Sequence, residues 1–75
     1  METIETDRCA LTLVVALWTW AETLAFVERR LIFYGLRPHK LRSRWRGLSV
    51  AIEIEAVGTA AQRMVFTRFV ESLRP

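Results

Sequence analysis

The longest apolar stretch of the chain runs from Cys9 to Val27 and carries one charged residue, Glu22. A run of about 20 mostly apolar residues is long enough to cross a bilayer as an α-helix. Gly35 follows this run, and glycine commonly ends a helix because it adopts the left-handed conformation without strain. The pattern therefore predicts a transmembrane helix over residues 9–35, preceded by an acidic flank over residues 1–8.

A basic connector, residues 36–47, follows the predicted helix and contains no acidic residue. Clusters of basic residues just beyond a membrane helix bind anionic lipid headgroups, and a basic flank on one side orients the helix. We therefore predict a single-pass membrane protein with its N-terminus outside and its C-terminus on the cytoplasmic or equivalent inner side. The residues expected to contact anionic lipid or an acidic partner are Arg37, Lys40, Arg42, Arg44 and Arg46.

The C-terminal segment, residues 48–75, admits two interpretations. Between Ser49 and Val57, apolar and polar residues alternate as in a half-buried strand. The same stretch also fits one long helix, because several of its apolar residues recur at helical spacing. Gly58 and the capping-box spacing of Thr59 and Gln62 favour a short strand followed by an amphipathic helix. Because the sequence shows no second strand, we expect this strand to pair with another molecule or another copy.

Apolar residues on this strand and helix are predicted to form a segment that docks on a partner protein. The strand presents one apolar face, and the helix carries an amphipathic stripe. The predicted docking residues are Val50, Ile52, Ile54, Met64, Val65 and Phe69. The fold expected from these patterns is mainly α, with one N-terminal transmembrane helix, a basic connector, a short strand and a C-terminal amphipathic helix.

Composition agrees with a chain that needs a partner or lipid to cover its apolar groups. The chain has 75 residues, of which 52% are hydrophobic, and a formal net charge of +3. A chain of this size can bury only a small core, so this apolar fraction is high for a protein standing alone.

Glu22 is the most unusual residue of the predicted membrane helix, because an ionisable group inside a bilayer is costly. Small and hydroxyl residues share its side of the helix, which suits packing against another helix. A proton relay through Glu22 is the alternative, but no other residue resembles part of a relay, so packing is favoured. The predicted partner-helix contacts are Thr12, Ala16, Thr19, Glu22 and Thr23.

Catalytic and metal-binding motifs are missing from the sequence. His39 and Cys9 stand alone, without ligands or a base at useful spacing. No phosphate-binding glycine loop or paired cysteine motif occurs, so we do not expect an enzyme, and the sequence does not identify any cofactor of the complex. Trp45 alone among the basic residues is weak support for nucleic-acid binding, because stacking surfaces usually need several aromatics.

These patterns favour an accessory, assembly or regulatory subunit of a larger membrane complex. Two other classes stay open. One is a helix-strand-helix homodimer, which binds nucleic acid or an acidic protein through its basic segment and needs no membrane. The other is a small membrane-active toxin or lysis-type protein. Fractionation separates the first from the membrane classes, and growth arrest on expression separates the toxin.

Overall fold

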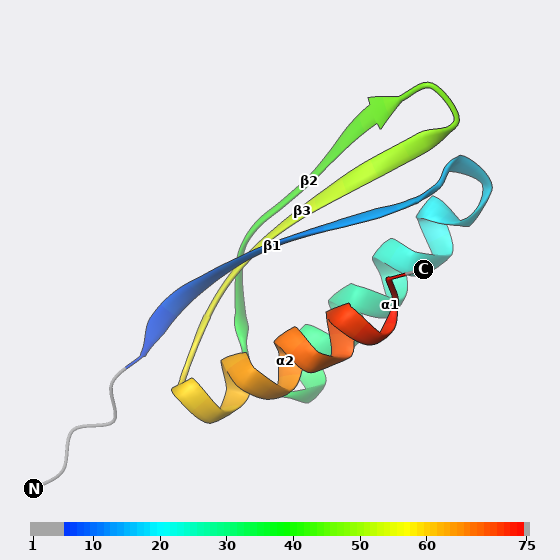
Figure 1. The fold of residues 1–75 in the computed structure, drawn as a ribbon. Helices are drawn as coiled ribbons and strands as arrows, with labels where there is room; N and C mark the ends of the chain where they lie inside the picture. The colour runs from blue at the N-terminus through cyan, green and yellow to red at the C-terminus, as the bar shows by residue number, and fades with distance from the viewer. Residues whose placement is uncertain (1–5, 75) are drawn as a thin grey trace, which may run out of the picture.

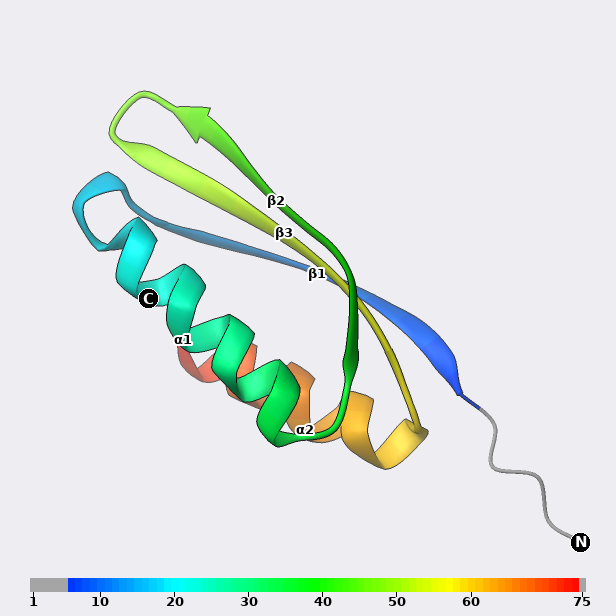
Figure 2. The ribbon, with the colours of Figure 1, turned by 180° about the vertical axis from the view of Figure 1, so that it is seen from behind.

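Three antiparallel strands form one twisted sheet, and two helices cover the same face of it (Figures 1 and 2). The computed structural model describes residues 6–74. Along the chain the elements are β1 (Asp7–Ala16), a short 3₁₀ turn η1 (Leu17–Thr19), α1 (Trp20–Phe33), β2 (Arg37–Arg46), β3 (Ser49–Gly58) and α2 (Ala60–Ser72).

The strand order in the sheet is β1-β3-β2, so β3 lies between the two others. A two-residue turn at Gly47 and Leu48 joins β2 to β3, and Gly47 takes a φ of +60°. Tight hairpin turns require such a left-handed residue, which glycine supplies without strain. β1 and β2 run in the same direction, and α1 crosses between them over one face of the sheet. Both β1 and β2 are therefore edge strands.

The core lies between the inner face of the sheet and the two helices. Leu13 of β1 stands directly opposite Ile52 of β3, and both side chains are fully buried. The helices contribute four more large, fully buried side chains, which are Val27, Leu31, Phe66 and Val70. Together the buried core cluster comprises Leu13, Val27, Leu31, Leu36, Ile52, Ile54, Ala56, Phe66 and Val70.

Gly35 ends α1 as the sequence predicts. Its φ is +80°, and its amide donates to the carbonyl of Ile32 at 3.0 Å. The amide of Leu36 donates to the carbonyl of Leu31 at 2.9 Å, which completes the double hydrogen-bond pattern of a glycine-terminated helix. This turn buries Leu36 in the core and directs the chain into β2.

The predicted capping box at Thr59 and Gln62 is confirmed. The amide of Gln62 donates to Thr59 Oγ1 at 3.3 Å, and the amide of Thr59 donates to Gln62 Oε1 at 2.9 Å. These bonds satisfy two amides that the first turn of a helix otherwise leaves unpaired. They fix the change from β3 to α2 directly after Gly58.

The predicted transmembrane helix over residues 9–35 is wrong. This stretch divides between β1 and α1, with a 3₁₀ turn between them. Neither helix in the described part of the chain combines the length and apolar character that crossing a membrane needs. Three further predictions depended on this helix and are wrong with it: the mainly α fold, the single-pass location and the orientation with the N-terminus outside. The architecture is a small α+β fold.

The physical reason for this error is visible in β1. Its residues alternate between the two faces of the sheet, with Leu13 buried and both Thr12 and Val14 exposed. The outward residues carry no charge after Arg8, so alternation and a continuous apolar run look alike in the sequence. The nineteen-residue stretch from Cys9 to Val27 is thus most of one edge strand, a 3₁₀ turn and the first eight residues of one helix.

The strand predicted at residues 49–57 is confirmed as β3, but its partners are not another molecule. β1 and β2 of the same chain pair with it on its two sides. The predicted basic connector supplies one of them, because most of residues 36–47 form β2. The predicted acidic flank, residues 1–8, lies mostly outside the described residues.

Candidate functional site

All five cations predicted to contact an anionic partner lie on β2 and are exposed. The sheet face away from the helices, here called the open face, carries their side chains. Each stands opposite a β3 residue of the row that also points away from the core. This β2 cation row consists of Arg37, Lys40, Arg42, Arg44 and Arg46.

A β-bulge at His39 is the reason that all five cations share one face. The register of β2 against β3 shifts between Pro38 and Lys40, so His39 has no residue opposite. In a regular strand, Arg37 and Lys40 would point to opposite faces because side chains alternate. The extra residue cancels this alternation and places both side chains on the open face.

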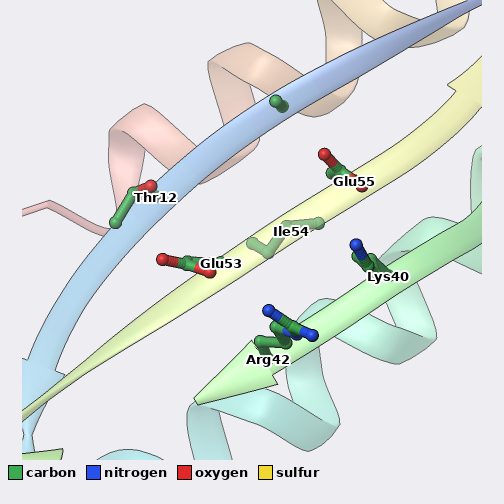
Figure 3. A pocket seen from close by; sticks show the side chains of 7 residues that line it. Thr12, Lys40, Arg42, Glu53, Ile54 and Glu55 are labelled. Carbon is green, nitrogen blue, oxygen red and sulfur yellow. The ribbon is translucent and has the colours of Figure 1, made fainter. Parts of the chain in front are cut away.

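The open face is hollowed beside the β2 cation row (Figure 3). Lys40 and Arg42 reach over the hollow from β2, and Glu53 and Glu55 project from β3. On the β1 side the lining residues are Ala10 and Thr12, whose short side chains leave the hollow open toward that strand. The hollow is lined by Ala10, Thr12, Lys40, Arg42, Glu53, Ile54 and Glu55.

The cations outnumber the acids on this face. Arg44 Nε lies 3.2 Å from Glu53 Oε1, and the two side chains are 62% and 35% exposed. An ion pair at this exposure is screened by solvent and contributes about 0–1 kcal/mol. Five β2 cations face two β3 glutamates, so the strip keeps a positive excess along the edge of the sheet.

The hydrogen-bonding direction of each strand follows from one contact at the β1 edge. Arg74 Nη2 donates to the carbonyl oxygen of Thr12 at 3.0 Å, so this carbonyl faces away from β3. Thr12 stands opposite Glu53, so the peptide groups of Glu53 must bond toward Arg42 on β2. Alternation then directs the amides and carbonyls of Leu41, Ser43 and Trp45 outward at the free β2 edge.

The aromatic residue of the basic segment, Trp45, lies on the helix side of the sheet. Its ring centroid is 4.8 Å from that of Trp20, and Trp20 Nε1 donates to Ser43 Oγ at 2.8 Å. Across residues 6–74, the rows that face the open side contain no aromatic side chain. The open face therefore offers charge and backbone groups, without a surface for stacking bases.

The five predicted partner-helix contacts do not form one helical stripe. Thr12 belongs to β1. Glu22 lies exposed in the first turn of α1, where its carboxylate interacts favourably with the helix dipole. Ala16, Thr19 and Thr23 do come together, because they line a shallow hollow at the end of β1. The other lining residues of that hollow are Val14, Val15 and Leu73.

The predicted docking residues divide between the core and the surface. Val50, Ile52 and Ile54 are buried inside this chain, so no partner is needed to cover them. Phe69 is half-buried and stacks on Phe26 with ring centroids 5.3 Å apart. Met64 and Val65 remain exposed on α2.

Sequence reasoning missed the free backbone edges of β1 and β2, because it recognised neither strand. The alternation of Leu41 and Trp45 with the cations was the signal for β2. Among the described residues, no group of three or more His, Cys, Asp or Glu side chains is placed to hold a metal ion. Cys9 is half-buried and His39 is exposed, and neither belongs to a polar cluster.

Comparison with known proteins gives no relative: no protein-family model, no curated protein and no solved structure matches the chain.

Proposed function

We propose that this chain is a binding module for an acidic, extended polypeptide segment, which adds as a fourth strand along the free β2 edge. The observation that carries this proposal is the alignment of five exposed cations on one side of that edge. An extended peptide that joins a sheet edge gains affinity from main-chain hydrogen bonds and specificity from its alternate side chains.

The free β2 edge can supply the main-chain bonds. The outward peptide groups of Leu41, Ser43 and Trp45 give donors and acceptors at every second residue. Lys40, Arg42, Arg44 and Arg46 alternate with these residues along β2, and their side chains project from the open face. An added strand places its own alternate side chains beside these cations, at the cross-strand distances where opposite charges attract.

Charge makes this edge selective. A cationic edge repels a basic strand and gains nothing from a neutral one. It attracts a strand with acidic residues at alternate positions. Natural proteins use lysine or arginine on edge strands to prevent unwanted pairing. The same residues therefore exclude ordinary strands and admit an acidic one.

The composition of the open face favours a peptide over a nucleic acid. Glu53 and Glu55 stand in the middle strand, where they would repel a phosphate backbone lying across the sheet. Phosphate contacts dominate the affinity of nucleic-acid binding, and single strands also need aromatic rings for stacking. The only tryptophan of β2, Trp45, is 57% exposed, but it lies on the helix side of the sheet, on the face opposite the cations.

A binding titration tests this proposal with a peptide that alternates glutamate and valine, alongside its glutamine counterpart. We expect the acidic peptide to bind and the neutral one to bind at least about tenfold more weakly. The variant with both Arg42→Glu and Arg44→Glu should lose the acidic peptide. The control is Arg29→Glu, a charge reversal at an exposed position of α1, which should leave binding unchanged when it is compared with the single variants Arg42→Glu and Arg44→Glu.

Two results would overturn the proposal. One is equal loss of binding in the Arg29→Glu control, which would indicate a general charge effect. The other is tighter binding of a single-stranded oligonucleotide of equal charge, which would make nucleic acid the ligand of this edge.

A further inference from the structure

We propose that a second copy of this chain pairs with the opposite edge of the sheet, so that two β1 strands join antiparallel in a symmetric dimer. The resulting sheet would have six strands in the order β2-β3-β1-β1-β3-β2. This inference does not depend on the proposed function, because it concerns β1 and leaves the β2 edge free in each copy.

The two edges of the sheet differ in how well they are protected against pairing. β2 carries a charged residue at five of its ten positions, a proline at Pro38 and a bulge at His39. Each of these features is a known protection of edge strands. β1 has none of them from Cys9 to Ala16, and its register against β3 runs without a shift. A long, regular, uncharged edge is a template for another strand.

The outward backbone groups of β1 suit an antiparallel copy, which would displace Arg74 from the carbonyl of Thr12. Thr12 directs its carbonyl outward, and alternation directs the peptide groups of Ala10 and Val14 the same way. A two-fold axis near Thr12 pairs Thr12 with Thr12 of the second copy, and Ala10 with its Val14. Such an interface is self-complementary by symmetry, which is the commonest way that soluble proteins form dimers.

Charge along β1 is compatible with this pairing. Asp7 and Arg8 are the charged residues of the strand, and both stand at its beginning. With the axis near Thr12, Arg8 of one copy stands opposite Ala16 of the other, so no like charges oppose one another. Self-pairing of two β2 strands would instead bring ten cations together, which cross-strand repulsion opposes.

Helix α2 extends the same surface beyond the sheet. It flanks the β1 edge, where a shallow hollow is lined by Cys9, Ala60, Arg63, Met64, Thr67 and Arg68. Met64 is 56% exposed there, although it is a large apolar residue. A second copy seated on the β1 edge would bring its own α2 toward this hollow and cover Met64.

The charges on this flank of α2 complement those of a second copy. Arg63 lies four residues before Thr67, and Glu71 lies four residues after it, so all three share one side of the helix. Two α2 helices that cross antiparallel near Thr67 place Arg63 beside the partner's Glu71. The symmetry repeats this contact, so the dimer gains two opposite-charge contacts.

Sedimentation of the full chain over a range of micromolar concentrations tests this proposal. We expect a monomer–dimer equilibrium for the natural sequence. Thr12→Pro should shift it toward monomer, because proline removes an outward amide without breaking a bond to β3. Val14→Lys should act likewise by charging the edge. Val65→Lys is the control, since Val65 is similarly exposed on the flank of α2 away from β1.

A charge exchange across the two-fold axis gives the sharper result. Arg63→Glu and Glu71→Arg should each weaken the dimer by up to about thirtyfold, because each removes both symmetric contacts, and the double variant should recover it. Circular dichroism of every variant separates dissociation from unfolding. A natural chain that stays monomeric at high micromolar concentration would overturn the proposal. A dimer that survives both Thr12→Pro and Val14→Lys would also overturn it, because the interface would then lie elsewhere.

Discussion

Trp20 Nε1 donates a hydrogen bond to Ser43 Oγ at 2.8 Å, which ties the first turn of α1 to the inner face of β2. The Trp20 ring also packs against Trp45, with centroids 4.8 Å apart. These contacts join an edge strand rich in cations to the helix beneath it. They hold the β2 cation row in place without using any of its charges.

Ser43→Ala should lower the free energy of unfolding by about 1 kcal/mol, because the half-buried indole N–H of Trp20 loses its acceptor. For a domain of this size that corresponds to a fall in Tm of roughly 4–8 °C. Thermal unfolding followed by circular dichroism measures this shift. Ser72→Ala is the control, since that hydroxyl bonds only within its own exposed helix turn, and a similar loss there would contradict the account.

Leu13→Ala should destabilise the chain by about 2–5 kcal/mol, because the removed methyl groups are fully buried against Ile52. Thr12→Ala, one residue earlier on the open face, should change stability by about 0.5 kcal/mol or less. Denaturant unfolding of the two variants, and of Leu13→Ala combined with Ile52→Val, checks the strand and its register. Equal effects at positions 12 and 13 would contradict the alternation of β1.

Glu53→Gln should strengthen binding of an acidic peptide at the β2 edge. The substitution removes a carboxylate that competes for Arg44 and adds one unit of positive charge to the open face. We expect the affinity to rise by up to about fivefold, because an exposed ion pair contributes about 0–1 kcal/mol. The gain should shrink as salt rises, because screening weakens exposed charges. An unchanged or weaker affinity would place the peptide away from Glu53.

Arg74→Ala should strengthen self-association of the chain. Arg74 Nη2 occupies the outward carbonyl of Thr12, which the second copy must bond instead. Since a hydrogen bond contributes about 0.5–1.5 kcal/mol net and each copy loses one competing bond, the dimer should gain roughly five- to a hundredfold in affinity. Sedimentation of Arg74→Ala beside the natural chain measures this gain. Weaker association would mean that Arg74 belongs to the interface and does not compete with it.

How far the sequence predicts this fold differs from strand to strand, for a physical reason in each case. β3 was predictable because Glu53 and Glu55 alternate with large apolar residues. β1 was hidden because Thr12 and its outward neighbours are uncharged, so the exposed row did not contrast with the buried one. In β2 the inner row is interrupted by Ser43, whose polar side chain is satisfied only by an indole 23 residues away.

The candidate site was predictable in composition and unpredictable in geometry. The basic residues were evident, and the expectation of an anionic partner rested on their number. Arg37 joins the other four on one face only because of the bulge at His39, which side-chain alternation along the sequence does not reveal. The free edge beside them depends on β3 lying in the middle of the sheet. This order results from the crossover of α1, a tertiary feature.

Amide hydrogen exchange on β2, measured by NMR with and without the alternating acidic peptide, tests the central claim most directly. The account predicts that the outward amides of Leu41, Ser43 and Trp45 become protected when the peptide binds, because they donate to its backbone. Amides of Arg42 and Arg44, already bonded to β3, should change little. Binding that leaves the three outward amides unprotected, or protects β1 instead, would contradict strand addition at the β2 edge.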